Sequence, residues 1–153
     1  MLLWRLSGAE HARTFDGGYG LLFNGRWNVA GNPVTYCATS PSLCVLEKLV
    51  HIEDPRLLPE LTMVAYDVPD DLGFDDIGLD DLPEDWRRQE GLTQRLGEQW
   101  REAREHALLR VPSAVVPFED SPDLNIVVNH AHPGVAAITV HLLAPFSLDP
   151  RLL

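Results

Sequence analysis

The stretch VTYCATSPSLCVLE, residues 34–47, passes directly from a strand pattern into a helix pattern. Its first part is rich in β-branched and aromatic residues, which predicts a strand over Pro33–Ala38. Ser40 followed by Pro41 is a helix start signal, because serine caps the free N–H groups and proline suits the first helical position. We therefore predict a helix from this point to about His51 or Ile52.

Further elements extend outward from this strand and helix. Runs rich in Val, Ile, Tyr and Thr predict strands at Leu2–Leu6, Leu61–Val68, Ser113–Val116, Leu124–Val128 and Ala137–Leu143. Apolar residues at helical spacing predict a second helix from Pro83 to Leu109, with a break near Gly91. The acidic stretch between the helices is expected to be a surface loop anchored by Leu72, Phe74, Ile77 and Leu79. Because strands and helices do not alternate regularly, the pattern favours an α+β fold over a doubly wound sheet.

The length and composition indicate one compact domain over residues 1–153. Hydrophobic residues make up 45% of the chain, which is enough to form a core without disulfide or metal cross-links. Cys37 and Cys44 do not form a disulfide framework, so we expect reduced thiols. The N-terminus does not resemble a signal peptide, and no apolar run approaches 18 residues. These features predict a cytoplasmic protein with no membrane segment.

The charge balance argues against direct binding to nucleic acid. The formal net charge is −11, with 12 basic residues against 23 acidic ones. A surface that binds a duplex needs several Lys or Arg residues to neutralise phosphates, and the basic residues here are not clustered enough for that. An acidic chain of this kind would associate quickly with a basic partner.

Glycine is most concentrated in the segment GGYGLLFNGRWN, residues 17–28, which also contains Arg26. Its glycines allow close backbone approach or several tight turns. The Arg26 guanidinium is suited to bidentate hydrogen bonding with phosphate or carboxylate. The glycine spacing matches neither a dinucleotide-binding motif nor a P-loop. The segment is therefore either a binding loop or a turn whose arginine pairs with a structural carboxylate.

Glu47 is the unusual residue of the first helix. At about 100° per residue, it lies in one stripe with Leu43, Leu46 and Val50. Because a buried unpaired charge is costly, this carboxylate is either half of a structural ion pair or a catalytic group at a cleft wall. Tyr36, on the strand just before, is suited to stacking on a flat heterocycle, although a strand tyrosine is also common in ordinary packing.

These segments together resemble the RES-domain family, named for arginine, glutamate and serine. The resemblance rests on a set of short motifs in order: Trp4-Arg5-Leu6, Gly25-Arg26-Trp27-Asn28, Gly31-Asn32-Pro33-Val34-Thr35-Tyr36, Leu46-Glu47, Trp86, Gly97 with Trp100, Val111-Pro112-Ser113, Asn125, Asn129 and His132-Pro133. It covers most of the chain. One departure is Tyr19-Gly20-Leu21-Leu22, where the family more often has a small Gly-Ala step.

The resemblance implies a fold similar to that of ADP-ribosyltransferase toxins: a split, mainly antiparallel β core with flanking helices and an NAD cleft. It also implies the toxin of a type II toxin–antitoxin system, which depletes NAD⁺ by hydrolysis or phosphorolysis of the nicotinamide–ribose bond. The alternative within the family is a mono-ADP-ribosyltransferase that modifies a cellular protein. The expected partner is an Xre-like helix-turn-helix antitoxin that covers the active site and supplies the DNA binding.

The resemblance also carries over the site residues. Glu47 would stabilise the oxocarbenium character that develops on the ribose. Arg26, with Arg5, would hold the pyrophosphate, Tyr36 would stack on nicotinamide and Ser113 would hydrogen-bond the substrate. NAD⁺ would be a substrate rather than a cofactor, and no metal is expected. The rival outside the enzyme class is a silent binding module in which Arg26 and Glu47 form a structural ion pair.

Overall fold

A single seven-stranded sheet organises the computed structural model, which describes residues 1–153. The strands lie in the order β4-β5-β6-β2-β1-β3-β7, and every neighbouring pair is antiparallel except β4 and β5. The strands are β1 (Leu2–Gly8), β2 (Val34–Ala38), β3 (Leu61–Asp67), β4 (Asp75–Asp76), β5 (Leu108–Pro112), β6 (Leu124–Asn129) and β7 (Thr139–Phe146). The helices are α1 (Gly18–Leu22), α2 (Pro41–Leu49) and α3 (Glu90–Ala103). This is the mainly antiparallel α+β fold that we predicted.

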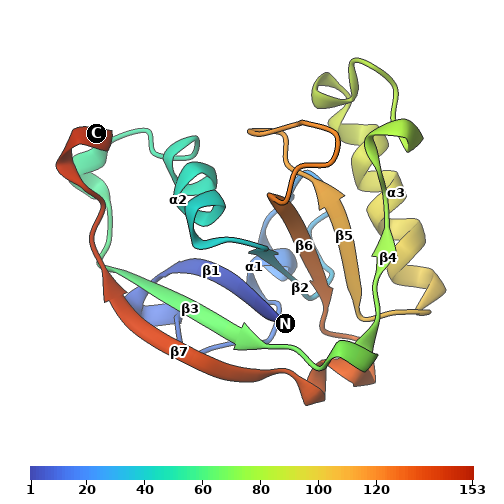
Figure 1. The fold of residues 1–153 in the computed structure, drawn as a ribbon, viewed down its shortest axis with the longest axis horizontal. Helices are drawn as coiled ribbons and strands as arrows, with labels where there is room; N and C mark the ends of the chain where they lie inside the picture. The colour runs from blue at the N-terminus through green and yellow to red at the C-terminus, as the bar shows by residue number, and fades with distance from the viewer.

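The sheet is split between β1 and β2. These strands share one residue pair, Trp4 with Ala38, whereas β1 pairs with β3 at seven positions and β2 pairs with β6 at five. Figure 1 shows the result: β1, β3 and β7 form one group, which diverges from the group of β2, β6, β5 and β4. The split core that the resemblance implies is therefore present.

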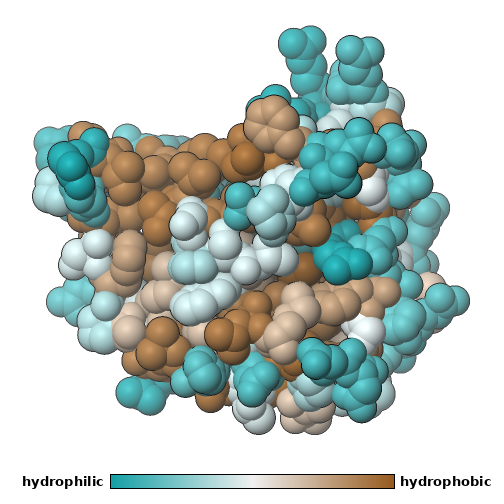
Figure 2. Space-filling view, in the orientation of Figure 1, coloured by the Kyte–Doolittle hydropathy of each residue, from teal (hydrophilic) through white to brown (hydrophobic).

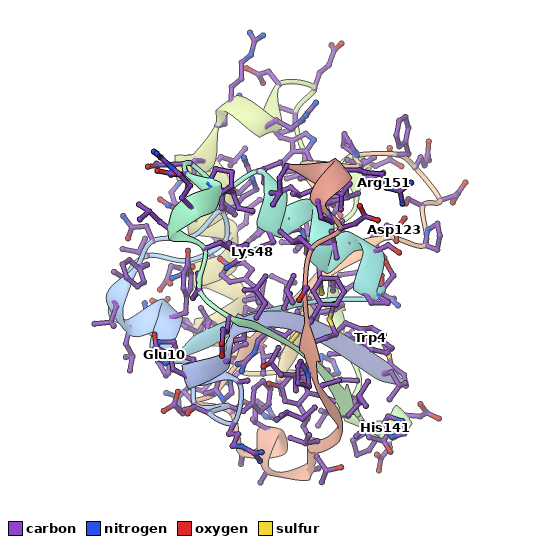
Figure 3. The ribbon with its side chains drawn as sticks, turned by 90° about the vertical axis from the view of Figure 1, so that its left-hand side faces the viewer. Trp4, Glu10, Lys48, Asp123, His141 and Arg151 are labelled. Carbon is purple, nitrogen blue, oxygen red and sulfur yellow. The ribbon has the colours of Figure 1, made fainter.

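The helix α2 follows β2 after only two residues and lies over the junction of the two groups (Figure 1). Its start is the predicted one: the Ser40 side chain accepts a hydrogen bond from the Leu43 N–H, and Pro41 is the first helical residue. The Ser40 hydroxyl also donates to Asp123 at 2.7 Å. Figure 3 shows Asp123 beside this end of the helix, with Lys48 on the last turn and Trp4 of β1 below. The helix is thereby fixed to the loop before β6.

Three apolar clusters fill the two faces of the sheet. One face buries Leu3, Cys37, Val64, Tyr66, Leu108, Ile126 and Val128 in a single cluster. On the other face, α3 covers the β5-β6-β2 group over a cluster built from Val34, Leu109, Val111 and Val127 with Trp27, Trp86 and Trp100. A smaller cluster of Ala38, Leu43, Cys44 and Met63 lies under α2. Adjacent strand residues such as Val127 and Val128 face opposite clusters, as the pleat requires.

Two predicted elements were wrong in position. The strand expected at Ser113–Val116 ends earlier, at Pro112, because the Ser113 hydroxyl accepts hydrogen bonds from the N–H groups of Val115 and Val116 and closes a turn. The long helix from Pro83 to Leu109 is also shorter. A 3₁₀ turn at Trp86–Arg88 precedes α3, and Arg104, with a left-handed φ of 54°, ends it.

Two elements were missed. α1 forms inside the glycine-rich segment, and the short β4 forms inside the acidic stretch. The predicted anchors of that stretch are confirmed: Leu72 and Phe74 pack on the first cluster, and Ile77 and Leu79 pack on the cluster under α3. None of the helices combines the length and the apolar composition that crossing a membrane requires.

Candidate active site

A large cleft opens where β1 and β2 diverge. It is bordered by Arg5–Gly8 of one strand and Thr35–Ala38 of the other, with α1 and α2 on its rims, and its volume is about 1870 Å³. Five of the 12 Lys and Arg residues border it, together with five of the 23 acidic residues. The cleft is therefore neutral overall, while the rest of the surface carries the whole net charge of −11. A neutral cleft repels an anionic ligand less than the acidic remainder of the surface, taken as a whole, would.

Cys44 of α2 fills the fork at which the two strands separate. Backbone groups of Leu6 in β1 and Ala38 in β2 lie near its sulfur and favour the ionised thiol. Burial, which outweighs these contacts, raises the pKa of the thiol to about 12. The thiol is therefore neutral and unreactive at physiological pH, and it serves to join α2 to both sides of the split.

Glu47 lies one turn further along α2 and borders the cleft. Of its predicted apolar stripe only Leu43 is buried, whereas Leu46 and Val50 are 40% and 59% exposed and Val50 borders the cleft. Figure 2 shows apolar surface over the region where Figure 1 places α2. Glu47 Oε1 accepts hydrogen bonds from Ser113 at 2.9 Å and Asn125 at 2.7 Å. Its Oε2 has no protein partner and is not buried.

No Lys, Arg or His lies within ion-pair distance of Glu47. The structural ion pair between Arg26 and Glu47, which the rival hypothesis of a silent module required, is absent. Glu47 is instead a partly buried carboxylate that is held by two neutral donors and directed into the cleft. No cation beside this group offsets the interaction of its carboxylate with a ligand.

Ser113 lies at the end of β5 and is completely buried. Its hydroxyl donates to Glu47 and accepts from the Val115 and Val116 N–H groups, so its hydrogen-bonding capacity is fully used. It presents no surface to the cleft. The direct substrate contact that we expected for Ser113 is therefore replaced in the structure by a contact with Glu47.

Two side chains of α3 hold the backbone of the loop that carries Arg26. The Thr93 hydroxyl donates to the Arg26 carbonyl at 2.5 Å, and the Gln94 amide donates to the Gly25 carbonyl at 3.0 Å. The guanidinium lies over the Trp86 ring, 5.5 Å from its centroid, and donates once, from Nη1 to the Arg87 carbonyl at 3.2 Å. The remaining donors of this guanidinium are available to a ligand in the cleft.

The Tyr36 hydroxyl organises the loop that carries Arg26. It donates to Asn28 Oδ1 at 2.7 Å and accepts from the Trp27 N–H at 3.0 Å. Burial raises the pKa of Tyr36 well above its ordinary range, so the hydroxyl stays protonated. The ring borders the cleft and meets the ring of Tyr19 edge-on, with centroids 6.1 Å apart.

Arg5 holds the opposite wall. Its Nη2 donates to the carbonyls of His11, Ala12 and Thr14 at 3.0–3.2 Å, which closes the loop after β1. Its Nε is buried without a partner, and its guanidinium lies 5.7 Å from the Tyr66 ring centroid. Nη1 has no protein partner and is not buried, so it remains free toward the cleft.

The five predicted residues therefore lie around one cleft, four of them on its surface and Ser113 behind Glu47. Our prediction from the residues gave no role to Asn125, although a polar residue inside the apolar strand Leu124–Val128 was a usable signal. It also gave none to Tyr19 and Phe23 of the α1 region, which border the cleft and are 50% and 55% exposed.

His130, next to the site, is expected to make the stability of the protein depend on pH. Its Nε2 lies 2.8 Å from Thr35 Oγ1, and its ring packs edge-on against Phe15, with centroids 4.5 Å apart. Burial lowers its pKa to about 4, with smaller and opposite effects of Asp16 and Arg5. An unfolded histidine titrates near 6.5, so the unfolded chain binds more protons below that pH. We expect the free energy of unfolding to fall as the pH decreases from about 6.5 to about 4.

Denaturant titrations at pH 7 and pH 4.5 measure this effect. The His130→Gln variant should lose this part of the pH dependence, whereas His141→Gln, on the exposed face of β7 (Figure 3), should keep it. An unchanged pH dependence in folded His130→Gln would contradict the assignment.

The sequence is similar to known proteins along almost its whole length. A family model described as the RES domain matches residues 2–150. The Toxin Res of Photorhabdus laumondii subsp. laumondii is 37% identical over 155 residues, with 99% of this chain and 97% of that protein covered. The Prs ADP-ribosylating toxin of Sphingobium sp. is 31% identical over 159 residues, with 98% and 95% covered.

Among solved structures, the chain is similar to one in the crystal structure of the M. tuberculosis MbcT-MbcA toxin-antitoxin complex. The TM-score is 0.67 at 20% identity, with 95% of this chain and 84% of that chain covered. At this identity the likeness concerns the fold, and it confirms the predicted α+β architecture.

Proposed function

Because the chain belongs to the RES domain family, we propose that it is the toxin of a toxin–antitoxin pair and depletes NAD⁺ by cleaving the nicotinamide–ribose bond. Its relatives are named as toxins, and one is named as ADP-ribosylating, a reaction that consumes NAD⁺. The observation that carries the proposal is Glu47, whose Oε2 faces the cleft without a neutralising cation. The reaction class needs a carboxylate in this state.

In the proposed reaction, the bond between nicotinamide nitrogen and ribose C1 breaks, and its electron pair leaves with nicotinamide. Nicotinamide departs as a neutral molecule, so no strong general acid is required. The sugar carbon develops positive charge, which the Glu47 carboxylate stabilises. A water or phosphate oxygen then bonds to the same carbon. With water, one proton is released and the product is ADP-ribose. With phosphate, the product is ADP-ribose 1″-phosphate.

The remaining cleft residues would hold the substrate from both walls of the split. Arg26 on the α3 side and Arg5 on β1 each keep guanidinium donors free, which suits the two phosphates of NAD⁺. Tyr36 would place its ring against nicotinamide, because its hydroxyl is already fixed by Trp27 and Asn28. Ser113 is better suited to act through Glu47 than on the substrate.

A protein acceptor is the second candidate. The relative from Sphingobium sp. named as ADP-ribosylating covers nearly the whole chain at 31% identity. The cleft is wide, and its α1 rim exposes Tyr19, Leu22 and Phe23. In this reaction a nucleophilic side chain of another protein would replace water at the ribose carbon, with the same role for Glu47.

We also propose an antitoxin partner of the Xre-like helix-turn-helix type that covers the cleft. The similar chain of known structure comes from a toxin-antitoxin complex. The rim residues Leu22, Phe23 and Val50 are apolar and more than half exposed, which suits burial against a partner. The acidic remainder of the chain leaves DNA binding to that partner.

The deciding experiment incubates the purified chain, freed from any coexpressed antitoxin, with NAD⁺ in the presence and absence of inorganic phosphate. We expect stoichiometric release of nicotinamide, with ADP-ribose or its 1″-phosphate as the second product. Mass spectrometry of a bacterial lysate treated in the same way identifies any ADP-ribosylated protein. If NAD⁺ is stable under all these conditions while the chain is folded, the proposed function is wrong.

A further inference from the structure

We propose that Ser113 and Asn125 are a pair of positioning residues that aim Glu47 at the substrate; this inference rests on the proposed function. Ser113 follows β5, and Asn125 lies on the neighbouring β6, where it pairs with Val111. Both donate to one oxygen, Glu47 Oε1, at 2.9 and 2.7 Å. Neither contact was expected from the sequence.

The two contacts fix the direction of each donor. An ionised carboxylate only accepts hydrogen bonds, so the Asn125 amide must present its nitrogen to Glu47. The Ser113 hydroxyl has a single proton, and its acceptor positions are occupied by the N–H groups of Val115 and Val116. That proton therefore goes to Glu47. The complete burial of Ser113 leaves it no competing partner in solvent.

Two donors on one oxygen determine the place of the other oxygen. With Oε1 held between β5 and β6, the plane of the carboxylate is set, and Oε2 remains as the acceptor that faces the cleft. The donors come from the sheet, whereas Glu47 comes from α2. The pair therefore fixes the helical carboxylate relative to the β2 side of the split.

The neutrality of both donors matters for the reaction. A lysine or arginine in the same place would hold the carboxylate equally well, but its charge would offset the negative charge that stabilises the developing cation. Hydroxyl and amide donors orient the group and leave its charge available. Ser113 and Asn125 are thus expected to affect the chemical step much more than the binding of NAD⁺.

Asn125→Ala, Ser113→Ala and the double variant test the pair. Losing one hydrogen bond to a charged group should lower kcat on the order of 10- to 100-fold, with little change in KM. The double variant should approach the loss seen on removing the carboxylate. If Ser113→Ala does not fold, because its turn is lost, Asn125→Ala carries the test alone.

Asn129→Ala is the matched control. Asn129 lies four residues along the same strand on the same face, but its amide donates to the Arg101 carbonyl rather than to Glu47. It is fully buried, so its loss should lower thermal stability and leave kcat of the folded enzyme unchanged. Wild-type kcat in folded Asn125→Ala, or an equal loss of kcat in Asn129→Ala, would overturn the proposal.

The test also separates failure of the proposed function from failure of this inference. If the wild-type chain does not consume NAD⁺, the proposed function fails, and crystal structures of the variants decide the positioning role. The Glu47 carboxylate should then leave its wild-type place in the double variant. A carboxylate that stays in place without both donors would refute the positioning role by itself.

Discussion

The Glu47→Gln protein is expected to lose NAD⁺ cleavage by about 10²–10³-fold in kcat while remaining folded. Glutamine has the same shape, and its amide oxygen can still accept from Ser113 and Asn125, so the local structure should persist. What disappears is the negative charge beside the ribose. The measurement is steady-state release of nicotinamide, together with a thermal denaturation curve for each protein.

Glu53→Gln is the control for this substitution. Glu53 follows α2 by four residues, is exposed and forms no hydrogen bond or ion pair through its side chain. It should keep the wild-type rate, although it removes the same charge from the chain. Full NAD⁺ turnover by folded Glu47→Gln would rule out the catalytic role of the carboxylate.

Gly97→Ala is expected to destabilise the protein strongly, by about 1–3 kcal/mol or more. A Cβ at Gly97 would lie 1.8 Å from the Trp27 carbonyl oxygen and 2.8 Å from its carbon, which are backbone atoms and cannot rotate away. The loop that contains Trp27 and the helix α3 must therefore move apart. Because Thr93, one turn earlier on the same helix face, binds the Arg26 carbonyl, the shift should also displace Arg26.

Gly91→Ala supplies the comparison within the same helix. A Cβ there would meet only Arg95 Nη1, at 3.7 Å, which is an ordinary contact. Alanine is the better helix former, so this variant should be neutral or more stable by up to about 1 kcal/mol. Urea denaturation of both variants gives the two free energies. Equal stability of Gly97→Ala and wild type would show that α3 does not rest on the Trp27 backbone as described.

Local signals predicted much of the fold. The strand and helix of residues 34–47 were predicted correctly because the cap at Ser40 and Pro41 is a short-range feature. The position of β5 was not, because the local turn at Ser113 that ends it was read as strand. The short β4 was not either, because it depends on a contact distant in sequence. Asp75 and Asp76 form a strand only beside Leu109 and Arg110 of β5.

In the candidate site, too, the residues with a local sequence signal were predicted, and the contacts between distant segments were not. Glu47 was singled out by its place on the first helix, and Arg26 by its glycine-rich surroundings. The partners of Glu47 could not be deduced, because Ser113 and Asn125 are 66 and 78 residues away along the chain. The prediction of a buried apolar face from Leu46 and Val50 was wrong, because the structure exposes both side chains.

The single pairing of Trp4 with Ala38 has a consequence for how this binding site can evolve. Beyond that pair, the facing edges of β1 and β2 have no strand partner, and they border the cleft. Peptide groups at these edges are present whatever side chains the strands carry. Substitutions along both strands leave these backbone donors and acceptors in place, so a ligand that bound them would still find them after the side chains had changed.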